Sequence, residues 1–220
     1  MKTTLILLAG RKGVGKSTAA NFIKNTIPNN NKAVIKSFAG KLKEIASILG
    51  IPHELSTGTL EQKNSLTQFS WDSSSEYLRS KYPNKSGWMT VREVLQVLGT
   101  DVFRDCFNEN VWVHSLMYDI SMEICGPGGY VVNPGWQFLD NLYYLIDDCR
   151  LPNEVRNFNE YGFDRTIKIH IKRPSETQDA HKSETALDDL PEFSFDYIIN
   201  NNGDLQDLYR KLSKILGDIS

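Results

Sequence analysis

The hydrophobic positions of this chain fall into short runs and helical repeats that alternate along the sequence. Residues 4–9 form a continuous apolar run of strand length, which is typical of a strand buried on both faces in a parallel sheet. Glycines follow, and apolar side chains then recur with helical spacing over residues 17–26. The pattern therefore predicts a strand, a glycine-rich loop and a helix as the first unit of the fold.

The alternation continues to the C-terminus. Further strands are predicted at residues 33–38, 142–146, 166–171 and 197–200. Further helices are predicted at residues 41–49, 90–98, 111–124, 153–161 and 204–216. The polar residues 51–90 predict short helices and loops, and the glycines and prolines of residues 126–135 predict a loop. Strands that alternate with helices indicate an α/β sandwich with a mainly parallel sheet.

The amino-acid composition is that of an ordinary globular protein. The 220 residues include 25 Lys and Arg against 27 Asp and Glu, a net charge of −2, and 40% are hydrophobic. These values exclude wholesale disorder and predict a single domain of 220 residues. The near-neutral charge argues against a dedicated, stable nucleic-acid partner.

Cysteine usage and hydropathy suggest the compartment. The three cysteines are too few and too scattered for a disulfide framework, and their odd number fits a reducing environment. The apolar stretch near the start is far shorter than a membrane span, so no membrane partner is expected. We therefore expect a cytoplasmic protein.

Residues 10–17 (GRKGVGKS) match the phosphate-loop pattern G-x-x-x-x-G-K-[ST]. Glycines let such a loop fold around an anion, so that backbone N–H groups point at phosphate oxygens. The following helix adds its positive N-terminal end. Lys16 can then reach the β- and γ-phosphates, and the Ser17 hydroxyl can bind Mg²⁺. The motif stands directly after a buried strand, which is the context that it requires.

A second acidic site follows the predicted strand at residues 142–146. Asp147 and Asp148 come directly after this strand, and Arg150 lies two residues further on. A phosphate loop needs a carboxylate near its Mg²⁺, typically at the end of a neighbouring strand. We therefore expect Asp148 and Arg150 to face the loop, the alternative being an aspartate that only caps the next helix.

Cations that could close over phosphates are the third candidate group. The polar residues 172–191 join two predicted strands, and a long unstructured connection in a compact domain is usually a lid or binding loop. The candidate cations are Arg92, Arg104, Arg150, Lys172, Arg173 and Lys182. The four histidines lack metal-ligand spacing, and Trp88, Trp112 and Trp136 are interpreted as packing residues.

Several of these landmarks together resemble the deoxynucleoside monophosphate kinases of tailed bacteriophages, which have the nucleoside monophosphate kinase-like P-loop fold. The resemblance spans most of the chain, although residues 51–90 and 126–141 match the family poorly. It is carried by residues 10–17, 38–40 with Lys43, 91–101, Trp112, 148–150 with Glu154, Arg173-Pro174 and 181–184.

The resemblance implies a three-layer α/β/α core with a parallel sheet, formed by residues 1–38, 142–171 and 192–220. It also implies a helical insert that binds the nucleoside monophosphate at about residues 39–141, and a lid at about residues 172–191. The implied reaction is ATP + dNMP → ADP + dNDP with Mg²⁺, for DNA precursor synthesis.

The resemblance also implies roles for individual residues. Those implied to bind ATP are Lys12, Gly13, Val14, Gly15, Lys16, Ser17, Thr18 and Arg173. Those implied to meet the deoxynucleotide are Lys43, Arg92, Gln96, Asp148 and Arg150. Lys16, Arg150 and Arg173 are the expected catalytic residues, and Ser17 and Asp148 the expected metal ligands. Steric exclusion at the 2′ position is expected to favour deoxyribose, but no residue is assigned to it.

Other functions remain compatible with the same motifs. The fold does not choose among acceptors, so dephospho-coenzyme A, shikimate or gluconate kinases are alternatives. A nucleotide-dependent binding protein without enzymatic activity and a nucleic-acid end kinase are two more. The sequence also leaves open which bases are accepted and whether the chain forms a homodimer.

Overall fold

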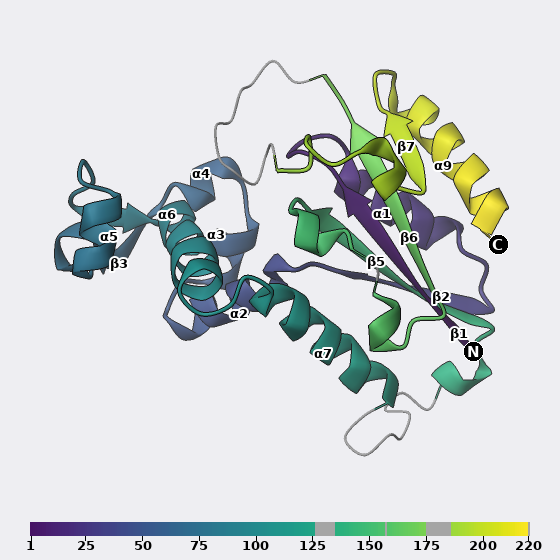
Figure 1. The fold of residues 1–220 in the computed structure, drawn as a ribbon, viewed down its shortest axis with the longest axis horizontal. Helices are drawn as coiled ribbons and strands as arrows, with labels where there is room; N and C mark the ends of the chain where they lie inside the picture. Colours follow the sequence, from purple (N-terminus) through teal and green to yellow (C-terminus); the bar gives the residue numbers. More distant parts are fainter. Residues whose placement is uncertain (126–134, 157, 175–185, 220) are drawn as a thin grey trace. The chain divides into compact units, whose positions relative to one another are not determined.

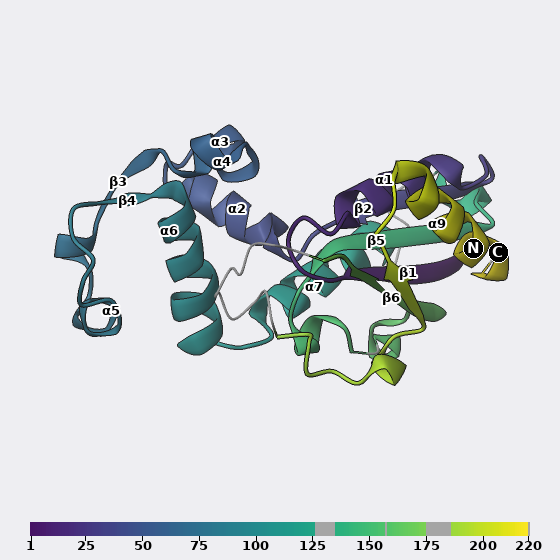
Figure 2. The same ribbon diagram turned by 90° about the horizontal axis from the view of Figure 1, so that it is seen from above.

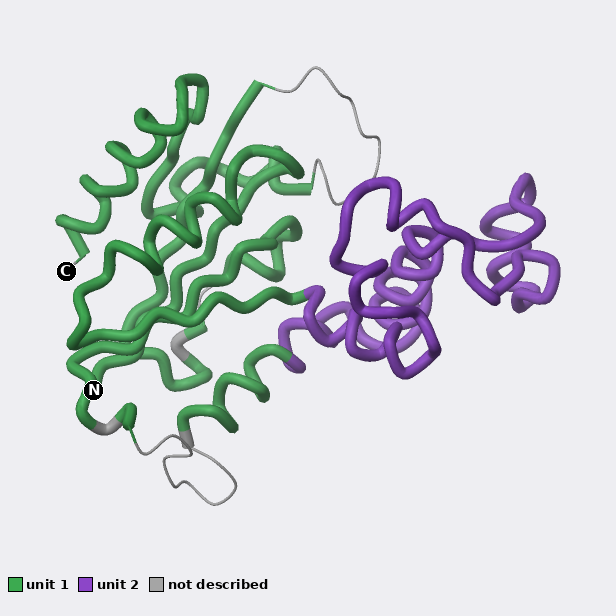
Figure 3. Tube along the Cα trace, turned by 180° about the vertical axis from the view of Figure 1, so that it is seen from behind, with its two compact units in different colours: residues 1–38, 116–220 green, residues 39–115 purple. Residues whose placement is uncertain are grey.

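The computed structural model describes residues 1–125, 135–156, 158–174 and 186–219 (Figure 1). These residues form two compact units, coloured separately in Figure 3. Unit 1 comprises Met1–Phe38 and Leu116–Ser220, and unit 2 comprises Ala39–Ser115. Unit 2 is thus inserted between two stretches of unit 1, and each unit is described by itself below.

Unit 1 is built on a five-stranded sheet with the order β2-β5-β1-β6-β7. Every neighbouring pair in this sheet is parallel. The strands are β1 (Lys2–Ala9), β2 (Asn31–Lys36), β5 (Asn141–Cys149), β6 (Arg165–Lys172) and β7 (Tyr197–Asn200). Because the strands are parallel, their carboxyl ends meet at one edge of the sheet.

Helices α1 (Lys16–Thr26) and α9 (Leu205–Ile219) cover one face of this sheet, which Figure 2 shows from above. Ala19, Ala20 and Ile23 of α1 share a core cluster with Leu208 and Leu212 of α9 and with side chains from all five strands of the sheet. The apolar stripes of both helices recur every three or four residues, so burying them against the sheet stabilises the layer.

The other face is covered by the second half of α7 (Val111–Cys125) and by the segment between β5 and β6. The Tyr144 hydroxyl of β5 donates to Glu123 of α7 at 3.3 Å, and the Tyr144 ring meets Phe163 edge-on. Both faces of the sheet are therefore buried, and the three-layer α/β/α core with a parallel sheet is confirmed.

Unit 2 is mostly helical. Its elements are α2 (Ala39–Ile48), α3 (His53–Thr57), α4 (Leu60–Lys63), β3 (Leu66–Ser70), α5 (Glu76–Lys81), β4 (Trp88–Thr90), α6 (Val91–Gln96), a π-helix (Val97–Asp105) and the start of α7. A separate core cluster that includes Trp71, Val91 and Val94 holds these elements together. Helix α6 begins with a capping box, in which Thr90 and Glu93 exchange hydrogen bonds.

Most of the elements expected from the sequence are confirmed, with three differences. The helix expected at residues 153–161 was wrong, because the chain there forms two short 3-10 turns, Pro152–Glu154 and Asn159–Tyr161. The polar region 51–90 contains an antiparallel pair, β3 with β4, in addition to short helices. Trp88 is 59% exposed on β4 and is not a packing residue, whereas Trp112 and Trp136 are buried.

Candidate active site at the carboxyl edge of the sheet

The phosphate loop lies between the end of β1 and the start of α1. Gly10 has φ +139°, and a Cβ atom there would lie 2.3 Å from the carbonyl oxygen of Ile171 on β6. Gly15, the N-cap of α1, has φ +105°. Both positions therefore require glycine, the first because β6 approaches so closely and the second because of its left-handed backbone.

Lys16 is the first residue of α1, and only 6% of it is exposed. Its Nζ donates to the carbonyl oxygens of Gly10 at 2.6 Å and Arg11 at 2.8 Å. A buried ammonium group must be hydrogen-bonded, and here the loop backbone contributes two acceptors. The cation is thereby held over the loop, within reach of an anion bound to the loop N–H groups.

Ser17 and Asp147 form the next contact. The Ser17 hydroxyl donates to Oδ2 of Asp147 at 2.6 Å. Asp148 Oδ1 instead accepts from the main-chain N–H of Phe38 at 2.8 Å, at the end of the segment that follows β2. The sequence predicts Asp148 as the metal ligand beside Ser17, but in the structure it is Asp147 that contacts the serine.

The difference between the two aspartates follows from strand geometry. Strand β5 continues through both of them to Cys149, whereas the sequence suggested that it ends at residue 146. The pairing of β5 with β1 shifts register between Ile146 and Cys149, so the strand is irregular at the two aspartates. There the Asp147 side chain meets Ser17, and the Asp148 side chain meets the N–H of Phe38. The acidic pair was readable from the sequence, but its orientation required knowing where the strand ends.

Arg150 lies in a turn that is held by a buried carboxylate. Glu154 is 2% exposed, and its Oε2 accepts from the main-chain N–H groups of Arg150 at 2.8 Å and Leu151 at 3.0 Å. These bonds fix the backbone that follows β5 and explain the 3-10 turn found there. Arg150, half-buried, is thus carried by an ordered turn at the carboxyl edge.

Cys149 lies between these charged residues and is fully buried. Burial raises the pKa of its thiol well above the usual range, and the neighbouring carboxylates of Glu154 and Asp148 raise it further. The thiol therefore stays protonated, which makes it a packing residue and not a nucleophile.

The segment before β7 is tied to the same edge of the sheet. Arg11 of the phosphate loop pairs with Asp188, and Lys172 at the end of β6 pairs with Glu192 at 2.8 Å. Arg173, an expected catalytic cation, is exposed directly after β6. Lys182 and most of the expected lid, residues 175–185, lie outside the described residues.

Three of the five acceptor residues expected from the resemblance lie in unit 2. Lys43 belongs to α2, and Arg92 and Gln96 lie four residues apart on α6. Side chains with this spacing project from the same face of a helix. All three are partly exposed.

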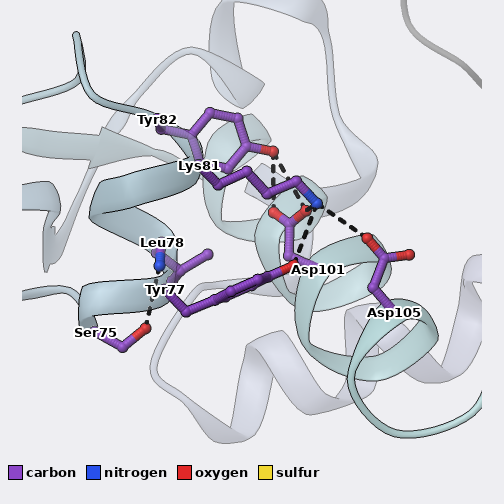
Figure 4. Close-up of polar contacts among 7 residues, drawn as sticks. All are labelled: Ser75, Tyr77, Leu78, Lys81, Tyr82, Asp101 and Asp105. Atoms are coloured by element: carbon purple, nitrogen blue, oxygen red, sulfur yellow. Dashed lines mark hydrogen bonds and ion pairs between the residues drawn. The ribbon is translucent and has the colours of Figure 1, made fainter.

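A buried charge cluster braces unit 2 from within (Figure 4). Asp101 of the π-helix is 1% exposed, and it accepts from Lys81 at 2.6 Å and from the Tyr82 hydroxyl at 3.0 Å. Lys81 also pairs with Asp105 at 3.0 Å. The hydrogen bonds to Asp101 and Asp105 raise the pKa of Lys81 far above its usual range, so this lysine is charged at every physiological pH.

Within the described part of the chain, no group of three or more His, Cys, Asp or Glu side chains could hold a metal ion by itself. No helix among those residues has the length and apolarity needed to cross a membrane.

The site combines a buried parallel strand, a glycine turn, a buried lysine and a serine–aspartate pair at the start of a helix. This combination is typical of phosphate-loop nucleotide-binding proteins. A family profile described as deoxynucleotide monophosphate kinase matches residues 30–212. The chain belongs to the deoxynucleotide monophosphate kinase family. Because the match begins after residues 10–17, it is independent of the loop motif.

Individual relatives agree with the family match. The deoxynucleotide monophosphate kinases of Escherichia phage RB69 and Enterobacteria phage T4 are 30% identical over 142 residues and 28% identical over 128 residues. These matches cover 64% and 58% of this chain, and the chain spans about half of each phage enzyme, 50% and 45%. A protein of Acanthamoeba polyphaga mimivirus, provisionally named for the same activity, is 28% identical over 222 aligned residues, 98% of this chain and 97% of the relative.

Proposed function

We propose that this protein transfers the γ-phosphoryl group of ATP to the 5′-phosphate of a deoxynucleoside monophosphate, giving ADP and a deoxynucleoside diphosphate. The observation that carries the proposal is the buried Lys16 ammonium beside the Ser17–Asp147 pair, in a chain of this family. The relatives' names support the choice of acceptor.

The donor side is assigned to the phosphate loop. In the proposed complex, the N–H groups of Gly13 to Thr18 bind the β- and γ-phosphates, with Lys12 nearby, and Lys16 exchanges its carbonyl partners for phosphate oxygens. This exchange is favourable because a charged acceptor makes a stronger hydrogen bond than a neutral carbonyl. The positive end of α1 adds to the attraction.

The proposed metal ligands are oxygen atoms, which Mg²⁺ prefers. The Ser17 hydroxyl and the Asp147 carboxylate already lie 2.6 Å apart, so the two donors fit one ion. We assign Asp147 to this role ahead of Asp148, whose Oδ1 is engaged by the Phe38 N–H. When bound, Mg²⁺ neutralises charge on the transferring phosphates.

The acceptor phosphate is already an anion, so the transfer requires alignment and charge neutralisation more than a general base. Arg150, Arg92, Gln96 and Lys43 are assigned to the acceptor, and Arg173 to the developing charge. The helical insert expected at about residues 39–141, of which residues 39–115 form unit 2, is proposed to bind the acceptor. The proposed lid at about residues 172–191 would exclude water from the reaction.

An acceptor screen with ATP and Mg²⁺ tests the function. The panel contains the four dNMPs, the corresponding ribonucleotides, dephospho-coenzyme A, shikimate, gluconate and a 5′-hydroxyl oligonucleotide, with ADP release and product chromatography as readouts. We expect one or more dNMPs to give dNDP at the highest kcat/KM. Release of ADP only with a metabolite or an oligonucleotide, or equally without any acceptor, would overturn the proposal.

A matched pair of variants tests the metal assignment. Asp147→Asn removes a carboxylate beside Ser17 and should lower kcat by about 100-fold, while raising the Mg²⁺ concentration needed for half-maximal rate. Asp148→Asn keeps an oxygen that can accept from Phe38 N–H, so its Mg²⁺ requirement should stay near wild type. The reverse ranking of the two variants would assign the metal to Asp148.

A further inference from the structure

Asn201 is a buried polar side chain that the proposed reaction does not use. It follows β7 directly and is 5% exposed. Asparagine is seldom fully buried unless its side chain is hydrogen-bonded. Here the Nδ2 amide donates to the carbonyl oxygen of Val14, in the phosphate loop, at 2.9 Å. Since a carbonyl can only accept, the orientation of the Asn201 amide is determined by its partner.

Two further contacts hold Asn201 in place. Its main-chain N–H donates to the carbonyl oxygen of Lys172, at the end of β6, at 2.7 Å. A Cβ atom at Gly15 would lie 3.0 Å from Asn201 Nδ2 and 3.5 Å from Leu208, so the asparagine packs directly against the glycine. Asn201 therefore links the end of the sheet to one particular peptide of the loop, that between Val14 and Gly15.

The geometry of this peptide has a consequence for anion binding. In a planar trans peptide, the C=O of one residue and the N–H of the next point in opposite directions. With the Val14 carbonyl held on Asn201, the Gly15 N–H is turned to the other side of the peptide. The buried Val14 side chain, 2% exposed in the core cluster, opposes rotation of the same peptide.

We propose that Asn201 is a positioning residue that aims the Gly15 N–H at the phosphates of the bound donor. This inference rests on one part of the proposed function, the binding of ATP to the phosphate loop. It gives Asn201 no contact with the adenine base, and a direct contact of Asn201 with the base is the competing reading. Without Asn201, the Val14–Gly15 peptide could rotate, and the Gly15 N–H would no longer be preorganised to bind a phosphate.

Binding of inorganic tripolyphosphate and of ATP, each measured by calorimetry with Mg²⁺, separates these readings because tripolyphosphate has no base. Asn201→Ala should weaken both ligands by about tenfold or more, since it leaves a buried carbonyl without its partner. Asn202→Ala, which changes an exposed asparagine one residue further on, is the matched control and should bind both ligands like the wild type.

The outcomes decide the inference in both directions. Loss of affinity for ATP alone, with tripolyphosphate unchanged, would overturn the positioning role and favour a base contact. Unchanged affinity for both ligands would overturn it as well. If Asn201→Ala does not fold, as judged by urea unfolding, Asn201→Ser, which retains a shorter donor, takes its place with the same expected direction.

The test is also separable from the proposed function. A wild-type protein that binds ATP and tripolyphosphate but phosphorylates no dNMP would refute the acceptor assignment and leave the Asn201 result valid. A wild-type protein that binds neither ligand would overturn both. In turnover assays, Asn201→Ala should raise KM for ATP with the KM for dNMP nearly unchanged, a split that general destabilisation would not produce.

Discussion

Helices α1 and α6 begin in opposite ways. In α6, of unit 2, the Thr90 side chain accepts from the N–H of Glu93 at 3.2 Å, and Glu93 accepts from the N–H of Thr90 at 2.8 Å. In α1, of unit 1, the N-cap is Gly15, and no side chain in the described part of the chain caps the helix. The first turn of α6 is closed by the side chains of its own residues, whereas α1 begins at a glycine without a side-chain cap, as the proposed phosphate binding requires.

Lys81 of unit 2 and Lys16 of unit 1 have different kinds of hydrogen-bond partner. Lys81 of unit 2 is paired with two carboxylates, so its charge is neutralised within the protein. Lys16 of unit 1 donates to backbone carbonyls, which carry no net charge. Lys81 is thus held by fixed anions, whereas Lys16 is held by neutral partners that the phosphates of the proposed complex can displace.

The variant expected to have the largest effect on activity is Lys16→Met. It removes the cation assigned to the β- and γ-phosphates and should lower kcat by about 10³-fold or more. Lys24→Met, at the exposed far end of α1, is the control and should retain wild-type turnover. Steady-state kinetics with ATP and a dNMP provide the measurement, and a Lys16→Met protein with normal kcat would contradict the assigned role.

The second largest effect is expected at Lys81, and it should appear in stability. Lys81→Met leaves Asp101, 1% exposed, without its cation. Removing one partner of a buried pair costs about 3–5 kcal/mol, and the lower end applies because Lys81 is itself 36% exposed. Urea unfolding should record this loss. Adding Asp101→Leu should recover much of it, and a double variant no more stable than Lys81→Met would contradict the ion-pair explanation.

A smaller effect tests the two helix starts directly. Thr90→Ala should cost about 1 kcal/mol of unfolding free energy by removing the cap of α6, and Thr90→Ser, which keeps the hydroxyl, should cost less. ATP with Mg²⁺ should raise Tm by the same amount in both variants as in wild type, because the ligand stabilises α1. A Thr90→Ala protein that loses this ATP-induced shift would break the comparison.

The smallest effect concerns His170 of β6, which is 7% exposed and lies against the ring of Phe195. Burial lowers its pKa, and the nearby charge of Lys172 lowers it further, with Asp188 and Glu192 opposing. The unfolded chain, with an ordinary histidine pKa of about 6.5, therefore binds the proton more readily than the folded one. The contribution of His170 to stability is complete above that pH and is lost as pH falls through the lower, folded pKa.

Urea unfolding of His170→Phe between pH 7 and pH 5 tests this linkage. Its unfolding free energy should fall less steeply with decreasing pH than that of the wild type, because the group that takes up the proton on unfolding is gone. Identical slopes for the two proteins would show that His170 is protonated equally in both states.

Much of the fold could be predicted because unit 1 has strong local signals. The continuous apolar run in β1 and the helical repeat of Leu208, Leu212 and Ile215 in α9 identify their elements without reference to the rest of the chain. Unit 2 was predicted less completely, because the β3 sequence LTQFS is largely polar and β4 has only three residues. Neither segment shows a clear alternation of apolar and polar residues. They are recognisable as strands only from their pairing with each other in the structure.

The turn at residues 152–154 shows the same limit. The pattern of residues 153–161 predicts a helix. In the structure the Glu154 carboxylate is buried and accepts from the N–H groups of Arg150 and Leu151. These bonds are local, but the burial that strengthens them is set by the packing around the turn, which the local pattern does not show.

The amino-acid sequence by itself determined the phosphate loop and most of the strands and helices of the α/β core, because each depends on residues that are neighbours along the chain. Only the tertiary structure decided that Asp147 and not Asp148 meets Ser17, and that Asn201 holds the Val14 carbonyl across 187 positions of sequence. The physical reason is that side-chain direction depends on where a strand ends and on what packs beside it, and both are set by contacts between distant segments.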